Sequence, residues 1–244
     1  MDQNPAMKII AHIRTDFATK FGIPRQSGLV QELKARILFE EEYRVTEAVR
    51  GLEEFSHIWV LWQFSGAIRP GWSPTVRPPR LGGNTRMGVF ATRSPFRPNP
   101  IGLSCLKLER IEHSPQWGPV LWVAGADLMD GTPIYDIKPY LPYADCHPEA
   151  VGGFAAAAPR RKLRVRDDQG LAGRMPPERW AALRGVLEED PRPSYQKDPD
   201  RVYGFEFGGW QVRFSVEGEE LLLRELRPLA GRQSENSEEG KETT

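Results

Sequence analysis

The sequence has few cysteines, no long apolar run and no excess of charge of either sign. Its two cysteines, Cys105 and Cys146, are too few for a disulfide framework and are not spaced like the ligands of a zinc knuckle. Met1–Ile13 has no basic stretch followed by an apolar run, and no later stretch approaches the roughly 18 uninterrupted apolar residues of a membrane helix. We therefore expect a protein of the reducing cytoplasm that does not enter a membrane.

The motifs of several common enzyme classes are also missing. The four histidines are widely spaced, and none pairs with another His or Cys at metal-ligand spacing, so we expect no catalytic metal. No Gly-x-Gly-x-x-Gly follows an expected strand, and neither a phosphate loop nor a Gly-x-Ser-x-Gly elbow occurs. Rossmann-type enzymes, nucleoside triphosphatases and serine hydrolases therefore lose their usual sequence support.

Composition limits the architecture without revealing a partner. The chain has 244 residues, of which 39% are hydrophobic and 27% charged, as is ordinary for a soluble globular protein. This length suits one large domain, or a principal domain with a small second one. Lys plus Arg and Asp plus Glu both number 33, so the net charge does not indicate a polyanionic partner.

The distribution of charge is uneven. No Asp or Glu occurs from Phe55 to Leu108. The basic residues of that stretch are Arg69, Arg77, Arg80, Arg86, Arg93, Arg97 and Lys107. With no carboxylate near them in sequence, they raise the local positive potential and would attract a polyanion through contacts that salt weakens. The alternative is a rigid surface loop whose arginines are simply solvated.

The apolar pattern predicts several short strands and few helices. The expected strands cover residues 9–13, 37–39, 56–64, 103–111 and 120–125. Between Arg69 and Pro100 the prolines and glycines exclude a long helix, and only 87–92 could be a strand. Thr46 is expected to cap a short helix. A mainly β fold, either a barrel or a sandwich, is favoured over alternating βαβ units.

A second, smaller unit is expected after residue 148. Gly152, Gly153 and the alanines at 155–158 indicate a domain boundary. A helix is predicted over 177–189, and alternating aromatic and aliphatic residues on either side of Gly208-Gly209 predict a hairpin. We therefore expect a β-barrel domain at 7–148, a small α+β domain at 159–229 and a disordered tail at 231–244.

The segment Arg77–Gly102 has the composition of a preorganised anion-binding surface. Prolines fix the backbone, glycines permit close approach, and guanidinium groups match phosphate and carboxylate. Of the nearby aromatic side chains, Trp59 and Trp62 are assigned to packing. The candidates for stacking on bases are Phe64, Trp72 and Phe96.

The segment Gly125–Tyr140 places Asp130-Gly131-Thr132-Pro133 soon after an expected strand. Taken alone, Asp-Gly is a turn. The functional alternative is a loop at a strand end whose carboxylates and backbone groups hold the polar end of a ligand.

Together these segments resemble a known family, the TsaA-like (TrmO-type) S-adenosylmethionine-dependent tRNA methyltransferases. The matching motifs are 22–26 (GIPRQ), 55–59 (FSHIW), 77–102 and 130–142. The resemblance covers 9–145 closely, and several long motifs in order are more specific than one short motif. It implies a homodimeric β-barrel that binds S-adenosylmethionine. It also implies N6-methylation of threonylcarbamoyl-adenosine, the base 3′ of the anticodon, chiefly in threonine tRNA.

The resemblance implies specific site residues. Those expected at the cofactor are Pro24, Arg25, Gln26, Ser65, Arg93, Leu103, Asp130, Gly131, Thr132 and Pro133. Ser65 stands where members of the family often have His. The arginines expected to bind tRNA are Arg77, Arg80, Arg86 and Arg97. No general base is identified, and the candidates for it are Tyr135, Asp136 and Tyr140.

Two other functions remain open. The chain could be a catalytically silent RNA-binding module, or a methyltransferase with another substrate. Cofactor binding separates the silent module from the enzyme. We also expect residues 160–226 to dock tRNA through the basic run Arg160–Arg166, so that a chain ending near Pro148 keeps its barrel. In the alternative, the hairpin packs against the barrel, and truncation exposes apolar surface.

Overall fold

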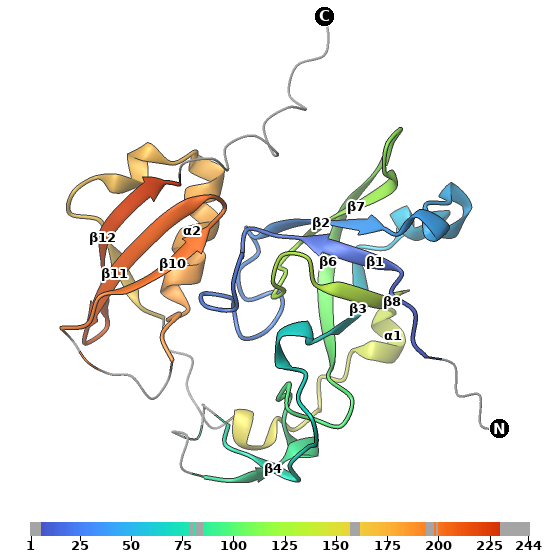
Figure 1. Ribbon diagram of the computed structural model, residues 1–244, viewed down its shortest axis with the longest axis horizontal. Coiled ribbons are helices and arrows are strands. Elements are labelled where there is room, and N and C mark those ends of the chain that lie inside the picture. The colour runs from blue at the N-terminus through green and yellow to red at the C-terminus, as the bar shows by residue number, and fades with distance from the viewer. Residues whose placement is uncertain are drawn as a thin grey trace, which may run out of the picture.

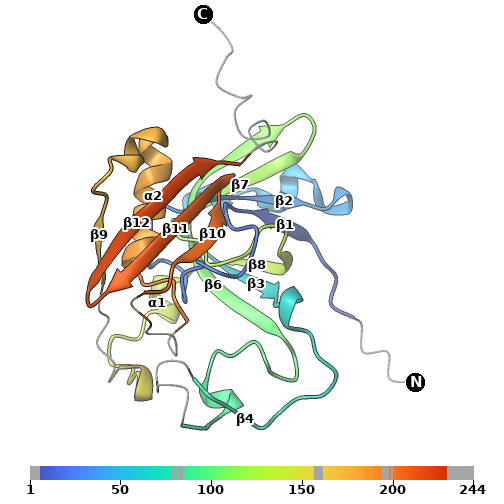
Figure 2. The ribbon, with the colours of Figure 1, turned by 60° about the vertical axis from the view of Figure 1, so that its left-hand side comes forward.

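A computed structural model describes residues 6–78, 81, 85–156, 162–193, 198 and 200–229 of the chain, which form a closed barrel beside a smaller four-stranded sheet with a helix (Figures 1 and 2). The tail expected at 231–244 and the predicted site residue Arg80 lie outside these described residues. The mainly β architecture expected from the sequence is confirmed, and the barrel is chosen over the sandwich.

Six antiparallel strands close the barrel in the order β1-β2-β7-β6-β3-β8. They are β1 (Ala11–Arg14), β2 (Lys34–Phe39), β3 (His57–Gln63), β6 (Ile101–Ser114), β7 (Gly118–Ala124) and β8 (Pro133–Pro139). Alternation along β3 sends Ile58, Val60 and Trp62 into the core, as the period of two in a strand requires.

Three long connections leave the barrel at the same end. Because neighbouring strands are antiparallel, the last residues of β1, β3 and β7 lie beside the first residues of β2, β6 and β8. The register shows this, since Lys34 pairs with Ala124 and Gln63 pairs with Ile101. The connections 15–33, 64–100 and 125–132 therefore share what we call the loop end of the barrel.

The C-terminal unit is a sheet with the order β10-β11-β12-β9, covered by one helix. Its elements are β9 (Arg164–Arg166), α2 (Pro177–Glu188), β10 (Tyr203–Phe207), β11 (Trp210–Glu217) and β12 (Glu220–Pro228). Phe205 and Val212 pair across the predicted hairpin, and both side chains are buried. Leu183 and Leu187 of α2 are fully buried in the same apolar cluster.

The first connection of the barrel shares this C-terminal core. Phe17, Val30 and Leu33 are buried in the same cluster as the residues of α2 and the sheet. The fit is close, because a Cβ on Gly185 of α2 would lie 2.6 Å from Val30 Cγ1, and one on Gly22 would lie 2.7 Å from the Phe205 ring. These contacts favour the alternative in which the hairpin packs against the barrel domain.

The remaining elements are short. They are β4 (Thr75–Val76), β5 (Met87–Gly88), α1 (Pro142–Asp145) and the 3-10 turns Glu41–Tyr43, Thr46–Val49, Leu52–Glu54, Ser65–Ala67, Val89–Ala91, Gly153–Ala155 and Leu171–Arg174. Within the described ranges no helix is long and apolar enough to cross a membrane.

Several expectations about elements need correction. The helix expected after Thr46 is two 3-10 turns. Strands β4, β8, β9 and β12 were not predicted. Trp62 is buried in the barrel core as expected. Trp59 packs too, but on the outer face of the barrel, where it is half-buried against Tyr140 and donates from Nε1 to Asp145 at 2.9 Å.

Candidate cofactor site and nucleic-acid interface

The residues predicted to bind the cofactor gather at the loop end of the barrel. Pro24, Arg25 and Gln26 lie in the first connection, and Ser65 and Arg93 lie in the second. The 130–133 loop follows β7 and enters β8, and Leu103 lies near the start of β6, where its side chain is 50% exposed. Residues separated by more than 100 positions are thus brought to one end by the strand order alone.

Hydrogen bonds fasten the three connections to one another. A guanidinium nitrogen of Arg93 donates to the side-chain oxygen of Gln26, joining the second connection to the first. The Gly28 amide donates to the Gly125 carbonyl at 2.8 Å, joining the first to the third. In addition, the Cys105 amide donates to Ser27 Oγ at 3.2 Å. The first connection is therefore held on both sides of residues 24–28, which we call the cofactor loop.

The 130–133 loop braces the end of β1. The Thr15 amide donates to Asp130 Oδ1 at 3.0 Å, and the Asp130 amide donates to the Phe17 carbonyl at 2.8 Å. Gly131 has φ +73°, a left-handed conformation that favours glycine. Because these amides and the Asp130 carboxylate already have protein partners, the loop shapes the site, and its direct contact with the cofactor stays a prediction.

Asp127 is a site residue that the sequence predictions missed. Ser104 Oγ donates to its Oδ1 at 2.6 Å and accepts from Trp62 Nε1 at 2.9 Å. Partial burial raises the pKa of the Asp127 carboxyl, whereas the hydrogen bonds from Ser104 and the Ser27 backbone, and the charge of Arg93, favour its ionised form. Burial is the larger effect, so the pKa is raised on balance, and the Asp127 carboxyl group lies beside Ser27 of the first connection. In sequence it carried the same signal as Asp130, an acid just after a strand.

The candidates for the general base are spread along β8. Tyr140 lies beyond the far end of that strand, roughly 20 Å from Pro133 at the usual rise per residue. The centre of its ring lies 5.8 Å from that of Trp59. The pKa of Tyr140 is raised, mainly by partial burial and to a smaller extent by the neighbouring Cys146. The structure thus separates Tyr140 from the loop end of the same chain.

Asp136 lies nearer to the loop end. Asp136 of β8 pairs with Leu61 of β3, and Leu61 pairs on its other side with Leu103 of β6. The three side chains therefore share the outer face of the barrel. Lys138 Nζ lies 3.0 Å from the Asp136 carboxylate. Tyr135 is the half-buried residue before it. Asp136 is therefore the base candidate best placed relative to Leu103.

Among the described residues, the arginines of the second connection other than Arg93 form no ion pair with a carboxylate. Arg86 donates to Thr75 Oγ1 at 2.9 Å, and Arg97 donates to the Thr92 carbonyl at 3.1 Å. The Arg69 guanidinium lies 4.1 Å from the centre of the Phe96 ring. Arg77 is exposed. The positive charge of these side chains is consequently uncompensated by any described acid, as an anion-binding surface requires.

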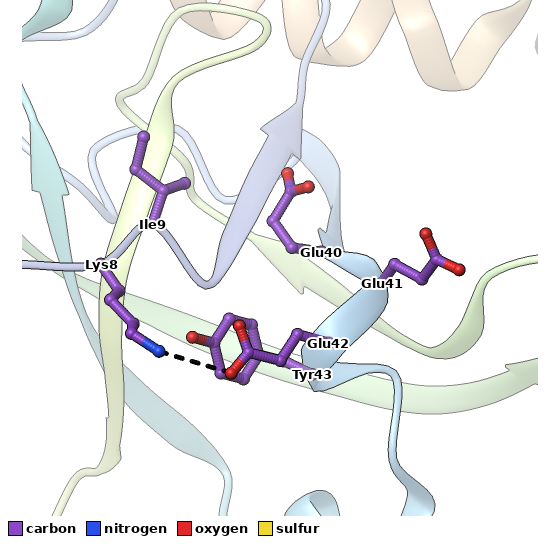
Figure 3. Close-up of a pocket in the computed structure, with 6 residues that line it drawn as sticks. All are labelled: Lys8, Ile9, Glu40, Glu41, Glu42 and Tyr43. Carbon is purple, nitrogen blue, oxygen red and sulfur yellow. Dashed lines mark hydrogen bonds and ion pairs between the residues drawn. The ribbon is translucent and has the colours of Figure 1, made fainter.

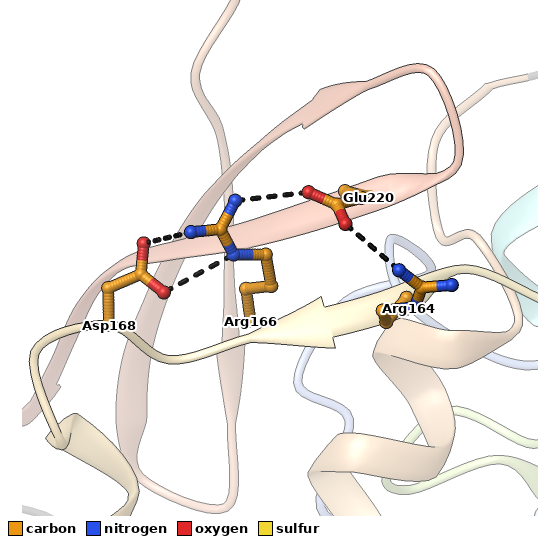
Figure 4. A network of polar contacts seen from close by, with 4 residues as sticks. All are labelled: Arg164, Arg166, Asp168 and Glu220. Atoms are coloured by element: carbon orange, nitrogen blue, oxygen red, sulfur yellow. Dashed lines mark hydrogen bonds and ion pairs between the residues drawn. The ribbon is translucent and has the colours of Figure 1, made fainter.

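The C-terminal basic run is different, because acids neutralise its described members (Figure 4). Glu220 lies 3.2 Å from Arg164 and 3.0 Å from Arg166, and Asp168 lies 2.8 Å from Arg166. Lys162 pairs with Glu188 and Glu189 in the same way. Arg160 and Arg161 lie outside the described residues. The charge argument for tRNA docking by this run is therefore weakened.

A shallow depression at the opposite end of the barrel is a poor candidate for either ligand (Figure 3). Its lining consists of Lys8, Ile9, Glu40, Glu41, Glu42 and Tyr43. Lys8 is already engaged by Glu42 at 3.4 Å, so the remaining glutamates would repel phosphate. Over the described ranges, no cluster of three or more His, Cys, Asp or Glu side chains could hold a metal ion.

Family models match most of the chain. The model of the tRNA-methyltransferase O N-terminal domain matches residues 12–146, and the model of the TrmO C-terminal domain matches residues 170–229. The two matches include the barrel with its loop end and most of the C-terminal unit.

Curated relatives and a solved structure agree with these matches. The chain is 42% identical over 227 residues to the tRNA (adenine(37)-N6)-methyltransferase of Escherichia coli, covering 90% of this chain and 96% of that protein. It is 39% identical to a Pseudomonas aeruginosa protein provisionally named as an S-adenosylmethionine-dependent methyltransferase, covering 87% and 93%. A crystal structure of TrmO from Pseudomonas aeruginosa superposes with a TM-score of 0.71 at 30% identity, covering 92% and 99%.

Proposed function

Because this chain belongs to the tRNA-methyltransferase O family, we propose that it transfers a methyl group from S-adenosylmethionine to N6 of the adenine at position 37 of tRNA. It is an S-adenosylmethionine-dependent tRNA (adenine-N6)-methyltransferase on a barrel, which explains why the Rossmann glycine motif is missing from the sequence. The observation that carries the proposal is the convergence of three connections with family motifs at the loop end.

The residues at the loop end fit the chemical groups of this cofactor. Arg93 offers a guanidinium to a carboxylate, the half-exposed Leu103 side chain offers apolar surface to an adenine, and Asp127 offers a carboxylate to a cation. When bound, S-adenosylmethionine supplies a methyl group on a positively charged sulfur. The protein then needs to hold the adenine amine in line, and positioning alone can supply much of the acceleration.

The finer substrate and assembly are part of the same proposal. The methylated base is threonylcarbamoyl-adenosine, chiefly in threonine tRNA, and the enzyme is a cytoplasmic homodimer. The threonylcarbamoyl group makes the N6 proton more acidic, so a weak base such as the Asp136 carboxylate suffices. Support comes from the family motifs at 22–26 and 130–142. Light scattering on the purified protein tests the dimer.

The proposed function is tested by methylation of purified tRNA. Protein, S-adenosylmethionine and tRNA that carries or lacks the threonylcarbamoyl group are incubated, and digested nucleosides are analysed by mass spectrometry. A mass increase of one methyl on adenine 37 is expected, with more product from the modified tRNA. tRNA binding with no methyl transfer would instead support the silent RNA-binding module, and methylation of another acceptor would support a different substrate.

Replacement of Arg93 by alanine is expected to weaken cofactor binding while the fold remains intact. The exposed guanidinium donates to Gln26 at the surface, so the loss is that of a charged hydrogen bond, about 1.5–3 kcal/mol, or roughly 10- to 100-fold in Kd. Calorimetry with S-adenosylmethionine measures it. Arg164→Ala is the matched control, because that exposed arginine pairs with Glu220 within the C-terminal sheet and is in none of the three connections. Equal affinities for Arg93→Ala and wild type would remove Arg93 from the site.

Binding of tRNA is expected to fall steeply with salt. Arg77, Arg86 and Arg97 lack described acid partners, so each would release counterions on meeting a phosphate. The Arg77→Ala, Arg86→Ala and Arg97→Ala variants should each lower the slope of log K against log salt by about 0.7–0.9. Fluorescence anisotropy over a salt series measures this slope. Arg166→Ala serves as control, since acids already neutralise Arg166. A slope unchanged in all three variants would give these arginines a structural role.

A further inference from the structure

The second connection displays two large aromatic side chains that the core does not use. Trp72 is 55% exposed and Phe90 is 73% exposed. Their ring centres lie 6.2 Å apart with planes inclined by 32°, within the range of interacting aromatic pairs. An aromatic pair left this open to water indicates a surface that meets a partner.

The local backbone holds these rings outward. Trp72 precedes β4 and Phe90 follows β5, and the two strands pair at Thr75 with Gly88. Next to the pair, the Val89 amide donates to the Pro74 carbonyl at 2.9 Å, and the Val89 side chain is buried. With Val89 anchored inward, its neighbour Phe90 is presented to solvent. The exposure is therefore built into the connection.

The surroundings of the pair carry charge of one sign. Arg86, the residue before β5, donates to Thr75 Oγ1 of β4 at 2.9 Å. Further along the connection, Arg69 lies over the Phe96 ring, which is itself 40% exposed. The whole stretch from Phe55 to Leu108 lacks Asp and Glu. Rings interleaved with guanidinium groups are the composition of surfaces that bind single-stranded nucleic acid.

The position of the pair leaves it accessible within the described structure. In both ribbon views β4 lies at the lower edge of the molecule, away from strands β10, β11 and β12 (Figures 1 and 2). A second copy of the chain is a weaker occupant, because stacking two such surfaces would bring like charges together. Charge complementarity therefore favours a polyanion, and the exposed rings favour one with unpaired bases.

We propose that Trp72 and Phe90 form a platform on which an unpaired base of the tRNA anticodon loop stacks, with Arg86 beside it for the phosphate. The proposal rests on the proposed function and names how the substrate is recognised. A base whose N6 is to be methylated leaves its stacked neighbours. Those neighbours lose stacking, and an aromatic surface on the enzyme restores it in a manner tolerant of sequence.

The test compares ring removal with ring replacement. The variants are Trp72→Ala, Trp72→Phe, Trp72→Leu and Phe90→Ala, and the probes are a labelled anticodon stem-loop and a fully paired RNA duplex of equal length. Both alanine variants should lose roughly 5- to 100-fold in stem-loop affinity, as expected for one stacked base. Trp72→Phe should recover most of the affinity and Trp72→Leu little, and duplex binding should change in none of them.

Other results would overturn the platform. Wild-type affinity in Trp72→Leu would show a general apolar contact, and equal losses for duplex and stem-loop would show no preference for unpaired bases. A change in mass by light scattering would reveal a contact between copies. Calorimetry with S-adenosylmethionine should be unchanged in all variants. Because stem-loop binding is measured without methyl transfer, failure of the platform and failure of the proposed activity are distinguishable.

Discussion

A chain that ends after Pro148 is expected to aggregate, or to lose its cofactor loop, because the core of the C-terminal unit includes residues of the barrel domain. Phe17, Val30 and Leu33 are 1%, 3% and 3% exposed, and they are buried in the cluster formed with α2 and the second sheet. Exposing three such side chains costs roughly 5–8 kcal/mol, which is comparable to the whole stability of a small domain. This revises the expectation of an independent barrel drawn from the Gly152-Gly153 boundary.

The measurement combines solubility, thermal unfolding and cofactor binding. Residues 24–26 lie between Phe17 and Val30, so the truncated chain should bind S-adenosylmethionine at least 10-fold more weakly, if it stays soluble. A chain ending at Leu229 is the control, because it keeps every described residue. A soluble, monodisperse truncated protein with the full chain's affinity would show that the barrel folds without the C-terminal unit.

Replacement of Gly102 by alanine is expected to be strongly destabilising. A Cβ at this inward-facing position of β6 would overlap the indole ring of Trp62. Trp62 is 8% exposed, and its Nε1 donates to Ser104 Oγ at 2.9 Å, so the ring has little room to move. Overpacking of this kind costs about 1–3 kcal/mol or more, which for a chain of this length lowers Tm by roughly 2–12 °C.

Thermal unfolding measures the effect, and two comparisons make it specific. Gly88→Ala is the matched control, because no atom lies within 4 Å of its added Cβ and its φ of −56° suits any residue. Adding Trp62→Leu to Gly102→Ala should relieve the overlap, so the two changes should not be additive. Equal midpoints for Gly102→Ala and Gly88→Ala would contradict the overlap.

Regular alternation and helical spacing made much of the fold predictable. Tyr203, Phe205 and Phe207 alternate before a Gly-Gly turn, and β10 and β11 form the expected hairpin. Strand β8 was missed because prolines stand at both of its ends and Asp136 and Lys138 interrupt the alternation of apolar residues. Its place is set by pairing with β1 on one side and β3 on the other, which local sequence does not encode.

The site was predicted unevenly for a similar reason. The motifs identified which loops matter, but they did not distinguish Asp127 from Asp130. The position of Ser104 in β6 places its hydroxyl within hydrogen-bond distance of the Asp127 carboxylate. The Asp130 carboxylate instead accepts from the Thr15 amide. The ion pairs of Arg164 and Arg166 with Glu220 could not be predicted either, because the paired residues are more than 50 positions apart in the sequence.

Strand β9 has a consequence for solubility. A closed barrel has no free edge, whereas in the described part of the chain the four-stranded sheet ends in β9 and β10. The unpaired amides and carbonyls of an open edge can pair with an extended segment of another molecule, which is the first step of β-aggregation. β9 is only three residues long, and Arg164 and Arg166 flank its centre. An incoming strand would have to lie beside a three-residue edge whose charged side chains are already held in ion pairs, so the short, charged β9 protects this edge against β-aggregation.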